Sequence, residues 1–156
     1  MKLIPILTMA VLAIPCCAQA GRKAEIFSGN AVASQMATLM QTARASGSGD
    51  ATLGNYESHA IKLSVRTTSG GAEVHAHYDD IFFVTQGKAT LITGGTVVDA
   101  KNGADGETEG SRIQSGTSRT IVKGDIVHIP AGTPHQLILA PGASYSAIVI
   151  KVKEAK

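Results

Sequence analysis

Three histidines in this sequence stand at spacings that could hold a metal ion. His75 and His77 are separated by one residue in a stretch that favours a strand, so we expect both imidazoles on one face. His135 follows a second apolar strand and the rigid turn Pro130-Ala131-Gly132. Imidazoles from two strands can bind a divalent transition metal and leave coordination positions open. These residues predict a metal site in the mouth of a β-barrel.

The spacing that ends at His135 resembles the second motif of the cupin superfamily, which is Gly, five residues, Pro-x-Gly, two residues and His. Gly124, Pro130, Gly132 and His135 keep every spacing of that motif. Leu139 stands where the motif often closes with Asn. The resemblance extends over about residues 58–153. It implies an all-β fold, an antiparallel jelly-roll (cupin) β-barrel.

The first cupin motif is His-x-His, three or four residues, Glu, six residues and Gly. His75 and His77 are followed here by Asp80 and, six residues later, by Gly87, so Asp replaces Glu and the corner is one residue short. The resemblance implies a divalent metal (Mn, Fe, Ni, Cu or Zn) held by His75, His77, Asp80 and His135. Since Asp is one methylene shorter than Glu, we expect Asp80 to be the weaker fourth ligand.

Other polar residues near these motifs have less specific interpretations. His59 and His128 are expected to be surface or packing residues, and Asp79 is a spare carboxylate if Asp80 points away. Gln136 follows a candidate ligand and could support it from outside the coordination sphere.

Two classes of function fit this site. The first is a metal-dependent enzyme acting on a small molecule, of the dioxygenase, lyase or isomerase type, by polarising its substrate or activating O₂. The second is a non-catalytic module that binds a small ligand or the metal alone. No acid or base stands out beyond the ligands, so no catalytic residue is assigned, and fold-level analogy does not choose between the classes.

The composition limits the partners. The chain has 156 residues, enough for one domain, and a net charge of +2 with scattered Lys and Arg residues. Only 4% of the residues are aromatic, which argues against a base-stacking surface. We therefore expect a small-molecule partner and no nucleic acid.

The N-terminus reads as a secretory signal peptide over residues 1–20. Lys2 is followed by the apolar run Leu3–Ile14 and by a small-x-small cleavage site, Ala18-Gln19-Ala20. We therefore expect cleavage before Gly21 and export to the periplasm or the extracellular space. Both cysteines, Cys16 and Cys17, would leave with the peptide, and no disulfide would form in the mature chain.

Two alternatives for this segment stay open. A retained anchor would need about 20 apolar residues to span a bilayer, and this run is shorter and interrupted by Pro5 and Pro15. Lipoprotein processing at Cys16 or Cys17 is the other, although Pro15 fits such a site poorly. No stable membrane span is expected.

Residues 21–55 are predicted to form a lead-in and one amphipathic helix, and residues 56–156 the barrel. Apolar residues recur at helical spacing from Val32 to Ala43, and Ser46-Gly47-Ser48-Gly49 predicts the end of the helix and a loop. We expect the helix to pack on the outside of the barrel, with a partner or dimer face as the alternative. A homodimer could also use the outer face of Ile81 and Phe83.

Short alternating segments with tight turns predict the strands of the barrel. In the strand at 59–67 we expect the polar residues to face outward, and in the run Ile81–Val84 we expect burial on both sides. Tyr78-Asp79-Asp80 is predicted to be a corner and Gly87-Lys88 a turn. Further strands are predicted at 72–77, 119–122, 125–129, 136–139 and 144–153, with a hairpin of 89–93 and 96–100 about Gly94-Gly95 and a long exposed loop at 101–118.

Overall fold

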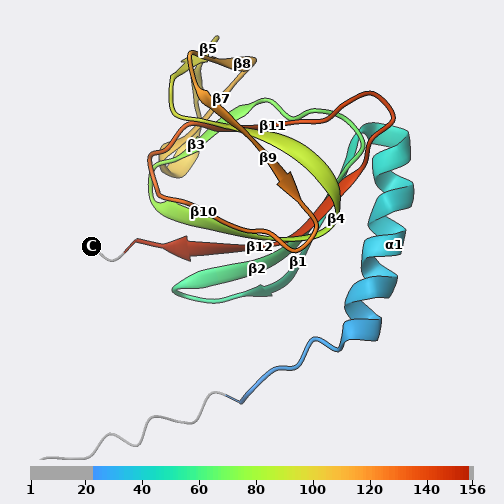
Figure 1. Ribbon diagram of the computed structural model, residues 1–156. Coiled ribbons are helices and arrows are strands. Elements are labelled where there is room, and N and C mark those ends of the chain that lie inside the picture. Colours follow the sequence, from blue (N-terminus) through green and yellow to red (C-terminus); the bar gives the residue numbers. More distant parts are fainter. Residues whose placement is uncertain (1–22, 155–156) are drawn as a thin grey trace, which may run out of the picture.

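A computed structural model describes residues 23–154, and the predicted signal peptide therefore lies outside the described residues. Within them one helix precedes a series of antiparallel strands (Figure 1). The elements are α1 (Gly29–Ser46), β1 (Ser48–Asn55), β2 (His59–Arg66), β3 (Ala72–His75), β4 (Tyr78–Thr93), β5 (Thr96–Val98), β6 (Lys101–Asn102), the 3₁₀ turn η1 (Ala104–Gly106), β7 (Glu107–Gly110), β8 (Arg112–Gln114), β9 (Thr117–Val122), β10 (Ile126–Ile129), β11 (His135–Ile138) and β12 (Tyr145–Lys153).

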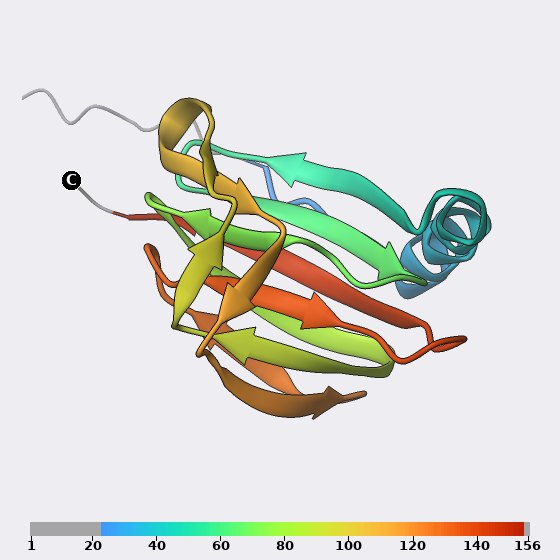
Figure 2. The same cartoon turned by 90° about the horizontal axis from the view of Figure 1, so that it is seen from above.

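The strands form two facing layers joined by one long strand. The main order is β1-β2-β12-β4-β11-β3-β7-β6, with β9 and β10 also paired to β4, and a small separate pair is formed by β5 and β8 (Figure 2). The first half of β4 pairs with β10 and β12, and its second half pairs with β9 and β11. The sheet wraps around an interior without closing completely. The predicted all-β antiparallel jelly roll with one N-terminal helix is confirmed.

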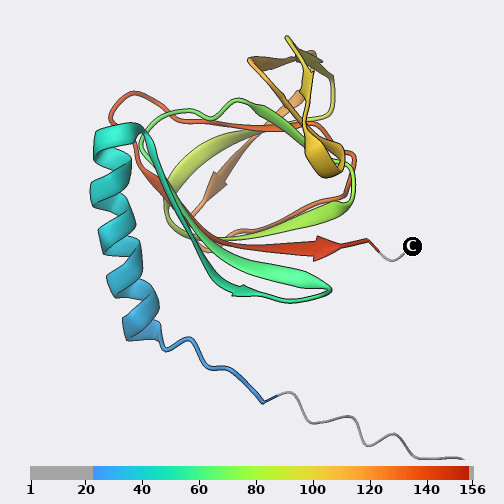
Figure 3. The same cartoon turned by 180° about the vertical axis from the view of Figure 1, so that it is seen from behind.

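Helix α1 has a local start and stop signal and a packing face. The Ser28 side chain accepts a hydrogen bond from the Ala31 N–H at its N-terminus, and Gly47 adopts a left-handed φ of 94° at its C-terminus. Leu39 and Ala43 are buried against Leu63 and Val65 of β2, so the helix lies on the outside of the sheet (Figure 3). Among the described residues, no helix is long and apolar enough to cross a membrane.

The polar side of β2 lies inside the molecule, so our expectation that it faces outward was wrong. Leu63 and Val65 point toward α1, and the alternate residues Lys62, Ser64 and Arg66 line a cavity between the layers. The reason is that the helix covers the outer face of this strand. Strand alternation then leaves the polar residues on the inner face.

Several local predictions also need correction. The segment predicted as a loop after α1 begins β1 at Ser48, and the predicted loop at 101–118 contains β6, η1, β7 and β8. Gly94 and Gly95 turn the chain with positive φ as expected, but β5 pairs with β8 instead of forming a hairpin with β4. β1 pairs with β2 and β6 pairs with β7, each across a short connection, whereas β7 also pairs with the distant β3, which short-range patterns do not reveal.

Strand β4 differs from its prediction at both of its expected ends. Tyr78-Asp79-Asp80 lies within the strand instead of forming a corner, and β4 continues through Gly87-Lys88. The run Ile81–Val84 is not buried on both sides, because Phe83 is 37% exposed while its neighbours Phe82 and Val84 are buried. The inward residues join the core, which comprises Phe82, Val84, Ala89, Leu91, Ile121, Ile129, Leu139, Tyr145 and Ala147.

Gly87 and Gly142 provide a matched test of this close packing. Both have nearly the same positive φ, 74° and 73°, so an Ala substitution costs a similar backbone strain of about 1–2 kcal/mol at each. A Cβ at Gly87 would overlap the Ser144 carbonyl oxygen, whereas a Cβ at Gly142 meets no atom within 4 Å. In urea unfolding we expect Gly87→Ala to lose about 1–3 kcal/mol more than Gly142→Ala. Equal losses would show that β4 and β12 are not packed this closely.

Candidate metal centre

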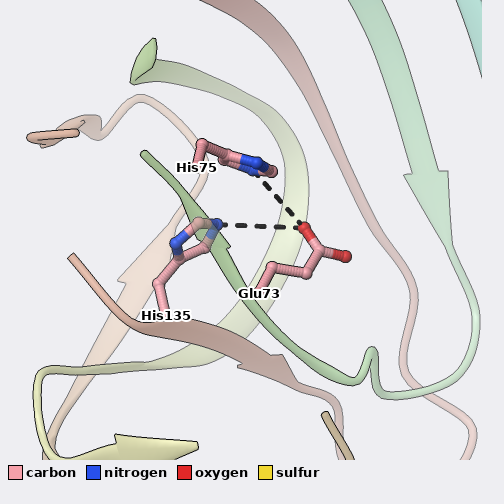
Figure 4. Close-up of side chains that lie close together, drawn as sticks. All are labelled: Glu73, His75 and His135. Atoms are coloured by element: carbon pink, nitrogen blue, oxygen red, sulfur yellow. Dashed lines mark ion pairs between the residues drawn. The ribbon is translucent and has the colours of Figure 1, made fainter. Parts of the chain in front are cut away.

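Neighbouring strands bring three of the chain's acidic and imidazole groups together. Glu73 and His75 lie two residues apart on β3 and share a face, and His135 begins β11 directly opposite Glu73. One ligand atom from each of these residues lies within 4.8 Å of the other two (Figure 4). This group is positioned by strand register and needs no loop to form it.

Asp80 completes a set of four donors. His75 Nε2 lies 3.3 Å from Asp80 Oδ2 and 3.8 Å from Glu73 Oε2. His135 Nε2 lies 3.7 Å from Asp80 Oδ2 and 3.9 Å from Glu73 Oε2. Donors bound at about 2.1 Å around one ion are separated by about 3.0–3.4 Å when adjacent. The two imidazole Nε2 atoms therefore lie near ligand spacing from both carboxylates, and Asp80 stands next to the Glu73, His75 and His135 group.

The other nitrogen of each imidazole is already engaged. His75 Nδ1 bonds to the Glu107 carboxylate, which lies opposite it on β7. His135 Nδ1 lies 3.1 Å from the Thr133 carbonyl oxygen, to which it donates. An acceptor at Nδ1 fixes the tautomer and leaves the Nε2 lone pair for a metal. Both rings are therefore oriented as metal ligands require.

The turn before His135 is fastened to the end of β3. The Gly132 N–H donates to the His75 carbonyl at 2.8 Å, and Gly132 has a φ of 73° that favours glycine. Asp79 accepts a hydrogen bond from the Ala131 N–H at 2.8 Å, and its other oxygen lies 3.3 Å from His128 Nε2. The Ala131 bond, followed by His128, lowers the pKa of Asp79. Asp79 thus holds the turn and is not a spare ligand.

Charge in the site favours an ionised Asp80. Burial raises the pKa of Asp80, but His75 and Lys151 outweigh burial and the net pKa is lowered. Lys151 Nζ lies 3.0 Å from Asp80 Oδ1. Burial lowers the pKa of His135, whereas at His75 the same effect is exceeded by Asp80 and Glu107, so the pKa of His75 is raised. A cation would therefore meet an anionic carboxylate and compete with a proton at His75.

The structure brings His75, Asp80 and His135 together but does not place His77 with them. His77 follows the end of β3 in a turn, its side chain is exposed, and it lies beside Gly106 of η1. His128 is also outside the group, with a side chain 57% exposed. His59 stacks on Tyr56 instead.

Two residues of this site were missed by the sequence reasoning. The sequence spacing could have pointed to Glu73. If His75 is taken as the second His of the first cupin motif, the four residues between His75 and Asp80 and the six residues between Asp80 and Gly87 fit that motif. Glu73 then stands at the first His position. Glu107 lies in a polar stretch with no periodicity, and only the pairing of β7 with β3 reveals it.

A cavity of about 410 Å³ opens beside the four donors. This volume lies in the range of about 300–1,000 Å³ that is typical of small-molecule sites. Its lining residues are Asp50, Lys62, Ser64, Arg66, Gly70, Gly71, Glu73, His75, Asp80, Phe82, Glu107, His135, Gln136, Leu137, Tyr145, Val149 and Lys151. A small molecule in it could reach a metal held by the donor set.

Comparisons with known proteins agree on the fold. No family model and no curated protein matches this sequence. The Schizosaccharomyces pombe Cnp3 cupin domain aligns with a TM-score of 0.52 at 13% identity, over 69% of this chain and 65% of that chain. The polyketide cyclase RemF from Streptomyces resistomycificus aligns with a TM-score of 0.50 at 14% identity, over 69% and 66%. The DMSP lyase DddQ from Ruegeria pomeroyi aligns with a TM-score of 0.50 at 17% identity, over 70% and 48%.

These structural similarities support a conclusion about the fold alone. The described chain spans less than two thirds of each of the three structures, and the identities are low. They show that the fold is the cupin jelly roll. The substrates and binding partners of those proteins are not assigned to this chain.

Gln136 offers a test of how the site is supported. Its side chain accepts from the Ile113 N–H at 3.0 Å and donates to the Gly70 carbonyl at 2.9 Å, joining β11 to two distant segments. Gln136→Met leaves both backbone groups without this partner, at about 1–3 kcal/mol each where they remain buried. Urea unfolding should show a loss of at least about 2 kcal/mol, and the exposed Gln114→Met a change of less than about 0.5 kcal/mol. A neutral Gln136→Met would mean that water replaces these bonds.

Proposed function

We propose that this cupin-fold chain is an exported metalloprotein that binds one divalent transition metal and acts on a small molecule held in the adjoining cavity. The proposed ligands are Glu73, His75, Asp80 and His135. The observation that carries the proposal is the convergence of both imidazole Nε2 atoms on both carboxylates, with each Nδ1 already held by an acceptor. His77, which the cupin resemblance implied as a ligand, is replaced in this set by Glu73.

The chemistry of the donors is compatible with each of the metals that the cupin resemblance implies. Two imidazoles and two carboxylates, without a thiolate, suit Mn, Fe, Ni, Cu or Zn. Four protein donors would leave a coordination position open in a five- or six-coordinate ion, and all four proposed ligands line the cavity. Such an ion supplies Lewis-acid polarisation of a bound oxygen atom or, if it is redox-active, activation of O₂.

An enzyme is favoured over a passive binding module by groups that surround the donors. Lys151 Nζ lies 3.0 Å from Asp80 Oδ1, so a proton-carrying side chain lies beside the proposed ligands. Two of the structurally similar proteins are named as a cyclase and a lyase, which is compatible with catalysis on this fold. The alternative is a module that holds metal and ligand without turnover. Oxygen consumption or product formation by the purified metal-loaded protein separates the two.

Metal occupancy tests the ligand set directly. The mature wild-type protein should hold one divalent ion per chain, measured by elemental analysis after dialysis. We expect His75→Ala, His135→Ala and Glu73→Gln each to weaken metal binding at least about tenfold, because the alanines remove a donor atom and the glutamine removes a negative charge. His77→Ala and His128→Ala are matched controls that should retain full occupancy, since both side chains are exposed.

Two outcomes would contradict this assignment. Full occupancy in His135→Ala would place the metal elsewhere in the chain. Loss of metal in His77→Ala, with retention in Glu73→Gln, would restore the ligand set that the cupin resemblance implies.

Export is the other part of the proposal and has its own test. The charged start, the apolar run and the Ala18-Gln19-Ala20 site support a mature chain that begins at Gly21. Intact-mass measurement of the native protein should give the mass of residues 21–156. A mass that retains residues 1–20 would argue for an anchor, and added acyl chains would argue for lipoprotein processing at a cysteine.

A further inference from the structure

The cavity beside the proposed metal site has a cationic wall that metal binding does not explain. Lys62 and Arg66 on β2 and Lys151 on β12 all line it. Lys151 pairs with Asp80, and Arg66 Nη2 lies 3.8 Å from Glu73 Oε1, at the far limit of an ion pair. Within residues 23–154 no ion pair joins Lys62 to a carboxylate. This wall can therefore attract a ligand that carries negative charge.

Tyr145 lies directly opposite Arg66 in the register of β12 and β2. Its side chain is only 1% exposed and lines the cavity, yet its hydroxyl has no hydrogen-bond partner among the described residues. Burial raises the pKa of Tyr145, so the hydroxyl keeps its proton and can donate. A buried hydroxyl without a partner is costly and rare in folded proteins. A ligand with an acceptor oxygen would satisfy it.

The charges around the cavity indicate how much negative charge that ligand should carry. The lining contains three cationic side chains, Lys62, Arg66 and Lys151, and four carboxylates, Asp50, Glu73, Asp80 and Glu107. With neutral imidazoles, three positive and four negative charges leave −1, and a divalent cation changes this to +1. One carboxylate neutralises that charge, whereas a dianionic phosphate would exceed it.

The remaining lining suits an organic ligand with a short apolar part. Phe82, Leu137 and Val149 lie on the cavity wall beside the polar groups. Small-molecule sites commonly combine such apolar surface with a few polar groups that fix the orientation. A planar carboxylate also matches the paired N–H donors of a guanidinium.

We propose that the cavity binds a small monocarboxylate that carries a second oxygen, a 2-hydroxy or 2-oxo acid. Its carboxylate accepts hydrogen bonds from Arg66 and Tyr145, and its second oxygen faces the metal. This inference rests on the proposed metal site and adds the class of molecule that the site takes. Arg66 and Tyr145 bind and orient this acid.

Lactate and lactamide are matched probes, because they have the same number of heavy atoms and differ in charge. Each is titrated into the mature protein loaded with Zn²⁺, and binding is followed by calorimetry. We expect lactate to bind at least about tenfold more tightly than lactamide. Arg66→Met and Tyr145→Phe should each weaken lactate binding at least about tenfold, since each removes a hydrogen bond to a charged group. The exposed Arg119→Met, on β9, should bind lactate as the wild type does.

Tyr145→Phe also separates ligand binding from a structural role. Its hydroxyl has no partner in the described residues, so the melting temperature of the ligand-free variant should equal or exceed that of the wild type. A lower melting temperature together with unchanged lactate affinity would make the hydroxyl structural and overturn the inference.

Other outcomes also decide the matter. Equal binding of lactamide, or tighter binding of inorganic phosphate or malonate than of lactate, would overturn the monocarboxylate class. If Zn²⁺ titration shows no bound metal, the proposed function fails separately. Lactate is then titrated into the metal-free protein, where binding that requires Arg66 and Tyr145 supports the carboxylate site and absence of binding refutes it.

Discussion

The antiparallel register of β3 with its two neighbours is the constraint on which the site depends. Pairing with β11 sets Glu73 opposite His135, and pairing with β7 sets His75 opposite Glu107. A slip of β3 by one residue would turn Glu73 and His75 to the other face of the sheet, away from His135 and Glu107. The hydrogen bond from the Gly132 N–H to the His75 carbonyl holds the end of β3 against the turn that delivers His135. The relative placement of these four side chains is thus set by backbone pairing.

The sequence was informative where the signal is local. Alternating apolar residues, Gly and Pro turns and the helical spacing from Val32 to Ala43 predicted most of the strands and α1. The spacing from Gly124 to His135 pointed to a residue that lies in the candidate site. Whether Glu73 or His77 lies in the candidate site depends on residues that are far apart in the sequence. β3 ends at His75 because the Ala76 N–H bonds to the Gly106 carbonyl of a segment 30 residues away, and the chain then turns His77 outward. Glu107 comes from that same distant segment.

The placement of α1 explains why the interior is polar on one side. By covering Leu63 and Val65 the helix makes the outer face of β2 a second small core, and the inner face is left with Lys62, Ser64 and Arg66. A strand pattern gives two faces but does not say which of them faces solvent. A charged inner face is tolerated because it borders a cavity with acidic partners, Glu73 and Asp80.

Strand β4 also limits how the molecule can move. It carries Asp80 near its start, and its second half pairs with β11, which carries His135, while β12 and β10 pair with its first half. Separating the two layers would break backbone hydrogen bonds between β4 and the strands on both of its sides. The layers should therefore behave as a single cooperative unit, with the slowest amide exchange along β4. Glu107, which bonds to His75 Nδ1, lies outside the ladders of β4, because β7 joins the sheet through β3.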